Sequence, residues 1–124
     1  MKLSTLFAVN AVFALIGGLG LLFMPQQIMA NYGTNLNEGG KLVTQLFSTV
    51  LFGIAIISWL FRNVKDKSAQ VAVLWGFVVA HGASFIIAFA SVLSGALNQM
   101  GWIDIILHGT FAAGFGYYLQ KAKT

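Results

Sequence analysis

Four long apolar runs, separated by short polar segments, account for most of the 124 residues. The runs extend roughly over Leu3–Met24, Leu42–Phe61, Val71–Leu97 and Trp102–Leu119. An α-helix rises ~1.5 Å per residue, so about 20 apolar residues cross a hydrocarbon layer of ~30 Å. The pattern therefore predicts an all-α integral membrane protein, in which residues 1–124 form a single domain with four transmembrane helices.

The segments between the runs are short, which favours antiparallel neighbours and an up-down-up-down four-helix bundle. The longest of them follows Pro25, a residue that suits a helix start, and contains Gly33, a residue that suits a helix stop. We therefore expect a short helical turn over residues 26–31. Asn35 and Glu38 have the spacing of a capping pair for the second long helix.

Composition supports the same class of protein. Hydrophobic residues make up 58% of the chain and charged residues 8%, against about 25% charged residues in an ordinary soluble domain. The chain has no cysteine, which excludes disulfides and zinc–thiolate sites. It has a net charge of +4, and six of the seven basic residues fall on one side of the predicted membrane: Lys2, Arg62, Lys65, Lys67, Lys121 and Lys123, against Lys41.

This asymmetry predicts the orientation, because short loops rich in Lys and Arg stay cytoplasmic. We expect a cell (inner) membrane protein with both termini in the cytoplasm, and a lipid bilayer rather than nucleic acid as the partner of the basic residues. Trp and Tyr residues near the ends of the runs are typical of the headgroup layer. The first run is longer than the ~7–15-residue core of a secretory signal, so we expect it to be retained as a span.

Small residues recur at four-residue spacing in each run, and this spacing keeps them on one helix face. Such stripes favour close helix packing in lipid. The predicted packing residues are Gly18, Gly53, Gly76, Ala80, Ser84, Ala112 and Gly116. The bulky residues predicted to face outward are Phe7, Phe47, Leu74, Phe85, Ile103 and Leu107.

Few side chains in the runs carry chemistry. Asp104 and His108 are four residues apart, so they can touch on one helix face. Gln45 and Thr49 are expected at a similar depth in the second run. Together they form a candidate ligand-binding site, because ionisable groups inside a membrane are costly and often functional. A helix dipole contact for Asp104 and an interhelical hydrogen bond for His108 are the structural alternatives.

His81 is expected near the midplane of the third run, hydrogen-bonded to a neighbouring helix. Counting ~1.5 Å per residue places it about 9 Å in depth from His108, a poor spacing for one metal or one haem. We therefore predict no metal and no cofactor. Phosphate loops, nucleophile elbows and metal-spacing motifs are missing, so we also expect no enzymatic activity.

Three segments have a familiar pattern: Leu22–Pro25 leading to Tyr32 and Gly33, then Phe52–Arg62, and finally Gly114–Leu119. They resemble small four-span bacterial membrane proteins of broadly DoxX-like type, and the layout is similar to four-span scaffold proteins that hold membrane enzymes together. The resemblance implies a four-span fold and no catalytic signature. The leading functional hypothesis is a multi-pass membrane protein that acts through helix–helix contacts, as an accessory or scaffold subunit or a homo-oligomer. The alternative is a small-ligand or proton-coupled transporter-like protein with an outward-facing Asp/His site.

Overall fold

The computed structural model describes residues 1–123 and contains five α-helices and no strands in that range. The helices are α1 (Leu3–Phe23), α2 (Pro25–Asn31), α3 (Glu38–Phe61), α4 (Lys67–Leu93) and α5 (Gly101–Lys123). The prediction of an all-helical chain is confirmed. So is the short helix after the first run, which begins at Pro25 and is followed by Gly33 in the left-handed region, with φ of 80°.

Three of the four expected spans coincide with helices that are long and apolar enough to cross a membrane. These are α1, α3 and α4, with 21, 24 and 27 residues. α5 does not satisfy this joint criterion of length and hydropathy, and it carries Asp104 in its first turn. Within the described residues, the apolar character that predicts a membrane protein thus comes from three helices.

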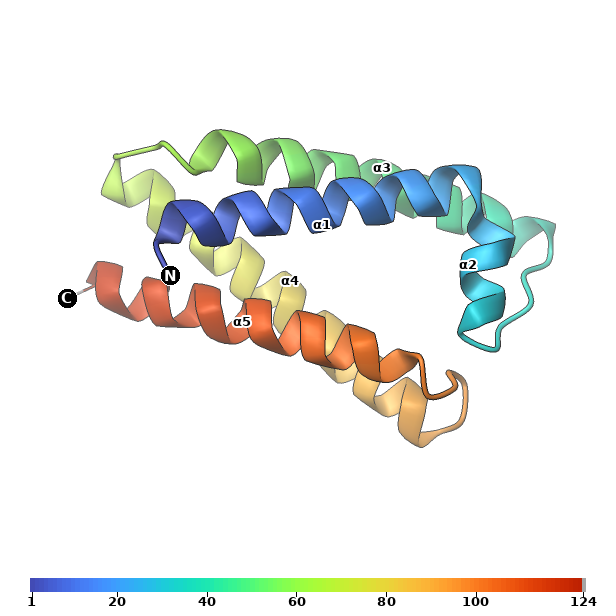
Figure 1. The fold of residues 1–124 in the computed structure, drawn as a ribbon. Helices are drawn as coiled ribbons and strands as arrows, with labels where there is room; N and C mark the ends of the chain where they lie inside the picture. The colour runs from blue at the N-terminus through green and yellow to red at the C-terminus, as the bar shows by residue number, and fades with distance from the viewer. Residues whose placement is uncertain (124) are drawn as a thin grey trace.

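The long helices form two antiparallel pairs instead of one evenly packed bundle. α1 packs along α3, and α4 packs along α5, whereas α3 is not packed closely against α4 (Figure 1). Figure 1 shows that the pairs come together where α1 begins and α5 finishes, and stand apart at the other end. We call these the termini end and the α2 end. The α3–α4 connection lies at the termini end, and α2 and the α4–α5 connection lie at the α2 end.

A cluster of aromatic and leucine side chains joins the two pairs near the termini end. Phe7 of α1 has no exposed surface, and its ring centroid lies 5.5 Å from that of Phe115 and 6.0 Å from that of Phe77. The buried cluster consists of Leu6, Phe7, Leu74, Phe77, Phe111, Phe115 and Leu119. Bulky residues, not small ones, therefore hold the helix pairs together.

This arrangement corrects part of the packing prediction. Phe7 and Leu74 were expected to face outward, and both are fully buried. Gly53 and Gly76 were expected in the interior, but each is exposed, and a Cβ atom added to either would meet open space. Gly18 does pack closely, because an added Cβ would lie 2.8 Å from a ring carbon of Phe52. Small residues therefore bring α1 and α3 together locally without forming a continuous seam.

The remaining predicted packing residues have mixed environments. Ala80 was expected in the interior but is exposed, whereas Ser84, Ala112 and Gly116 are half-buried, and an added Cβ at Gly116 would meet open space. Of the residues expected to face outward, Phe47 and Ile103 are about half exposed, Phe85 is exposed, and Leu107 is half-buried against the aromatic cluster. Apolar character alone could not separate these faces, because lipid-facing and protein-facing side chains are equally apolar in a membrane.

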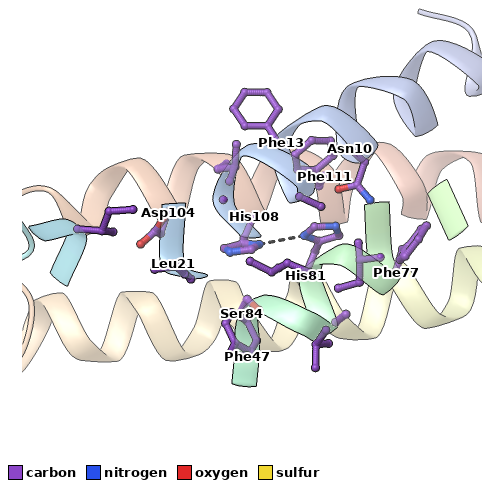
Figure 2. A pocket seen from close by; sticks show the side chains of 18 of the residues that line it. Asn10, Phe13, Leu21, Phe47, Phe77, His81, Ser84, Asp104, His108 and Phe111 are labelled. Atoms are coloured by element: carbon purple, nitrogen blue, oxygen red, sulfur yellow. Dashed lines mark hydrogen bonds between the residues drawn. The ribbon is translucent and has the colours of Figure 1, made fainter. Parts of the chain in front are cut away.

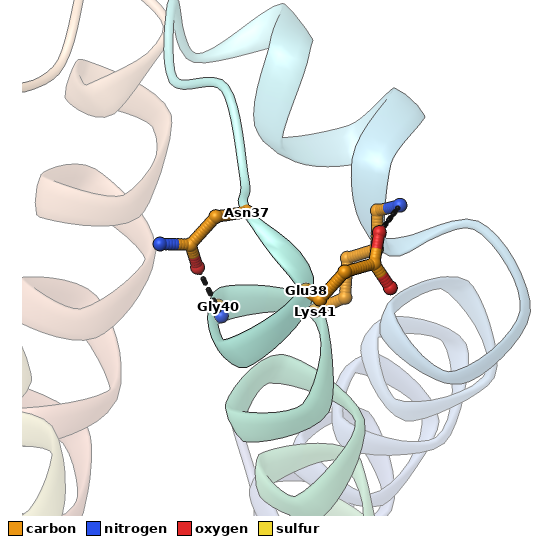
Figure 3. A network of polar contacts seen from close by, with 4 residues as sticks. All are labelled: Asn37, Glu38, Gly40 and Lys41. Carbon is orange, nitrogen blue, oxygen red and sulfur yellow. Dashed lines mark hydrogen bonds and ion pairs between the residues drawn. The ribbon is translucent and has the colours of Figure 1, made fainter.

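The helix ends show two further differences from the predictions. Asn37, not Asn35, caps α3: its side-chain oxygen accepts a hydrogen bond from the Gly40 amide at 2.7 Å (Figure 3). α4 ends at Leu93 rather than Leu97, because Gly95 adopts a φ of 77° that ends the helix. The four-residue difference matters for the depth of the histidines.

Candidate functional site

A cavity of about 540 Å³ lies between the two helix pairs, on the α2 side of the aromatic cluster. Its volume is within the ~300–1,000 Å³ typical of small-molecule sites. The walls are mostly aliphatic and aromatic, with contributions from all five helices. The cavity exists because the two helix pairs diverge from the aromatic cluster toward the α2 end, so that facing side chains do not meet across the gap.

Four polar side chains follow one another along the cavity. Figure 2 shows Asp104, His108, His81 and Asn10 in that order, with Ser84 near the histidines and Phe13 and Phe111 beside them. They belong to α5, α4 and α1. The polar row thus connects both helix pairs within walls that are otherwise apolar.

The two histidines meet in this row. The Nδ1 atoms of His81 and His108 are 2.9 Å apart, which is a hydrogen-bonding distance. The prediction that His81 bonds to a neighbouring helix is confirmed, but the predicted 9 Å offset in depth is wrong. α4 ends four residues earlier than expected, and this alone removes about 6 Å at ~1.5 Å per residue.

The hydrogen bond constrains the protons of the pair. In a pair of neutral imidazoles, one Nδ1 carries the proton and the other accepts it. The accepting ring must then hold its own proton on Nε2, and the donating ring has a free Nε2 lone pair. The pair therefore keeps one N–H donor and one acceptor on its two Nε2 atoms.

Three phenylalanine rings pack against the His81 imidazole. Its ring stacks on Phe111, with centroids 4.9 Å apart and an interplanar angle of 25°. Phe115 lies on it at 5.8 Å and 15°, and Phe77 of the same helix lies at 6.2 Å. These contacts orient His81 toward His108 and leave it only 8% exposed.

Asp104 is linked to the α2–α3 connection rather than to His108. The Tyr32 hydroxyl donates a hydrogen bond to Asp104 Oδ1 at 3.2 Å, while His108 bonds to His81. Burial, followed by the neighbouring Asp104 carboxylate, raises the pKa of Tyr32 from its ordinary value of 10.0 to about 12. Tyr32 consequently remains a neutral donor over the working range of pH. Asp104 and His108 thus face the same cavity, as expected, but each forms its hydrogen bond with a different partner.

A strap between the α2–α3 and α4–α5 connections bridges the diverging pairs at the α2 end. The backbone amide of Asn98 donates to the Tyr32 carbonyl at 3.0 Å, and the side-chain amide of Asn98 donates to the Asn31 carbonyl at 2.9 Å. Gly33 makes this approach possible, since an added Cβ there would lie 3.3 Å from the Asn98 side chain. The strap lies over the end of the cavity that Tyr32 and Asp104 line.

The cavity is open sideways, between the two helix pairs. Phe47 and Val50 of α3 line it and are 51% and 54% exposed, and Ala80 of α4 is also exposed. On the α1–α5 side, Phe13 packs edge-on against Phe111 at 6.0 Å. Phe13 is nevertheless 50% exposed, so this side is also open. With the aromatic cluster at one end and the strap at the other, the open routes into the cavity are sideways, between the two helix pairs.

Two of the predicted site residues lie outside this cavity. Gln45 donates to the Leu22 carbonyl at 3.1 Å and thus ties α3 to α1. Thr49 is exposed and donates to the Leu46 carbonyl of its own helix at 2.8 Å. Their expected depth in the second run suggested that they belong to the site, but their side chains lie on other faces of α3. Neither lines the cavity.

The structure adds Tyr32 and Asn10 to the predicted site. Asn10 is 2% exposed and donates to the hydroxyl of Ser58, which is fully buried on α3, at 2.9 Å. Its place as the one strongly polar residue in the first apolar run was a signal that could have identified it. Tyr32 had no such signal, because its role depends on the fold of the α2–α3 connection.

The described residues contain no group of three or more His, Cys, Asp or Glu side chains arranged to hold a metal ion. Compared with protein-family models, curated proteins and solved structures, the chain matches none. The geometry of the cavity is therefore the basis of the functional argument.

Proposed function

We propose that this chain is a multi-pass integral membrane protein that binds a small, largely apolar molecule between its two helix pairs. The observation that carries the proposal is the cavity of about 540 Å³, in which Asp104, His108, His81 and Asn10 lie among mostly apolar lining residues. Polar groups placed inside an apolar pocket are the usual means of orienting a bound ligand. A role in packing alone would not leave these groups around an open volume.

The proposal includes four spans, with α5 as the fourth, and both termini on the cytoplasmic side of the inner membrane. Two features support it. α5 is antiparallel to α4 and extends over 23 residues, and the α3–α4 connection lies at the same end as the start of α1 and the end of α5 (Figure 1). The basic residues Lys2, Arg62, Lys65 and Lys67 are therefore gathered at that end. A fold of broadly DoxX-like type is part of the same proposal.

Loss of the cavity volume provides the test. Ala80→Phe would place a ring in the cavity from α4, and Ala83→Phe makes the same change three residues further on, at an exposed position outside the cavity. We expect native mass spectrometry of the protein from mild detergent to detect a co-purified small molecule in the natural chain and in Ala83→Phe. The Ala80→Phe variant should lose most of it. An empty natural chain, or equal occupancy in both variants, would contradict the proposal.

A contact-based role as a scaffold or accessory subunit, or as a homo-oligomer, is the second candidate. It is favoured by Gly53 of α3 and Gly76 of α4, which lie on exposed faces with open space at the Cβ position. Close helix approach in lipid depends on small residues of this kind. Gly53→Leu and Gly76→Leu should then abolish a cross-linked dimer or a co-purified protein partner and leave the monomer folded. A purely monomeric natural chain with no partner would exclude this role.

A further inference from the structure

The charge of the cavity wall limits the ligands that it can hold. Asp104 is the only carboxylate among the lining residues, and no lysine or arginine lines the cavity. The other titratable groups that face Asp104 are Tyr32 from the α2–α3 connection, His108 from the same helix, and His81 from α4. An anionic ligand would therefore lose its hydration on entering the cavity, and no fixed cationic side chain there would compensate for that loss.

No basic side chain neutralises Asp104 within the described part of the chain. Lys41 is the basic residue nearest in sequence to the α2 end, and its Nζ forms an ion pair with Glu38 at 2.6 Å on the exposed first turn of α3 (Figure 3). Tyr32 donates a hydrogen bond to one carboxylate oxygen but carries no positive charge. The positive end of the α5 dipole offsets about half an elementary charge at most. The wall thus favours a cation near Asp104.

The rest of the cavity favours an apolar body on that cation. Phe13, Phe77 and Phe111 line it beyond the histidines, and aromatic faces attract cations as well as apolar groups. The open sides between the helix pairs have an apolar rim, because the exposed lining residues there are Phe13, Phe47, Val50 and Ala80. A molecule already dissolved in the bilayer can reach the cavity by this route without passing the strap at the α2 end.

From these observations we infer that the cavity binds a lipophilic cation, such as a hydrophobic amine or onium ion, which enters from the bilayer between the two helix pairs. The cationic centre lies near the Asp104 carboxylate, and the apolar groups lie against the phenylalanine rings. This inference rests on the proposed function, because it assigns a ligand class to the same cavity.

Two ions of nearly the same shape and opposite charge provide a direct test. Tetraphenylphosphonium is a permanent cation and tetraphenylborate is a permanent anion, so their difference in binding reports charge preference alone. By equilibrium dialysis of the natural chain in mild detergent, we expect saturable binding of tetraphenylphosphonium and binding of tetraphenylborate that is weaker by about tenfold or more. This comparison uses no variant and does not depend on the folding of one.

Variants then locate the site. Asp104→Asn keeps an acceptor for Tyr32 but removes the charge, and it should weaken tetraphenylphosphonium binding by about tenfold or more. The matched control is Asp66→Asn, the same change at the N-cap of α4 outside the cavity, which should leave binding unchanged. Ala80→Phe should block binding.

The outcomes separate this inference from the proposed function. Tetraphenylborate binding that equals or exceeds that of the cation, and that Ala80→Phe abolishes, would keep the cavity as a ligand site and overturn the cationic class. Equal tetraphenylphosphonium affinity in the natural chain and in folded Asp104→Asn would also overturn the cationic class. Failure of both probes to bind would overturn the inference, while the co-purified molecule tests the proposed function separately.

Discussion

The aromatic cluster predicts that Phe7→Ala strongly destabilises the protein, although Phe7 lies in a helix that is apolar throughout. The Phe7 ring has no exposed surface and lies 6.4, 6.0 and 5.5 Å, centroid to centroid, from the rings of Phe61, Phe77 and Phe115. Transfer of the ring to lipid costs almost nothing, since lipid is as apolar as the protein interior. The loss is therefore that of packing, and three aromatic pairs at ~0.5–1.5 kcal/mol each give roughly 1.5–4.5 kcal/mol.

Phe23→Ala is the matched control on the same helix. Phe23 is 74% exposed, so its truncation should change the free energy of unfolding by no more than ~0.5 kcal/mol. Both variants can be unfolded in mixed micelles with an increasing fraction of sodium dodecyl sulfate and followed by tryptophan fluorescence. An interior made of small-residue stripes, with Phe7 facing lipid, predicts the same small effect for both variants. Equal midpoints for Phe7→Ala and Phe23→Ala would refute the packing described here.

Two further predictions concern Tyr32 and the glycines. Phenolate absorbance should show Tyr32 titrating near pH 12, and Asp104→Asn should lower that midpoint by removing the neighbouring charge. Because the pKa of Tyr32 is raised in the folded state, the stability that neutral Tyr32 contributes is complete below pH ~10 and is lost as the pH rises through 12. A Tyr32 titration midpoint that Asp104→Asn leaves unchanged would contradict the contact between Tyr32 and Asp104. Gly18→Ala should destabilise the chain by ~1–3 kcal/mol, because its Cβ would lie 2.8 Å from Phe52. Gly53→Ala, with open space around it, should be neutral or stabilising in the same unfolding assay.

The helices were largely predictable from the sequence. Long apolar runs identified α1, α3 and α4, and the Pro25 and Gly33 signals identified α2. The end of α4 was misplaced because residues 94–97 continue the apolar pattern, whereas Gly95 ends the helix through its backbone conformation. Hydrophobic patterning records where a chain can lie in a membrane, but it carries less information about where a helix stops.

The packing of the helices was much less predictable. In a soluble protein, the water-facing side of a helix is polar and reveals the buried side. In α1, Phe7 and Phe23 are both apolar, yet one is fully buried and the other is 74% exposed. The same ambiguity assigned Gly53 and Gly76 to an interior that the chain fills with phenylalanine instead. An apolar side chain is compatible with the lipid-facing and with the buried face of such a helix, so the sequence does not identify the buried one.

The candidate site was predictable where its members differ chemically from their surroundings. Asp104, His108 and His81 are ionisable residues in apolar runs, and all three line the cavity. Gln45 and Thr49 were chosen by their expected depth but do not line the cavity, because the direction in which a residue faces depends on how the helix pairs dock. The contribution of Tyr32 depends on the strap at the α2 end, which no local pattern encodes.

The central claim is that His81 and His108 meet in the wall of a cavity within the apolar helices. The chain has only two histidines, so ¹⁵N labelling of histidine in bilayers gives a spectrum of just these two rings. The structure predicts complementary neutral tautomers, one protonated at Nδ1 and the other at Nε2, with a coupling between the two Nδ1 atoms across their 2.9 Å hydrogen bond. Two identical tautomers without that coupling would contradict the account.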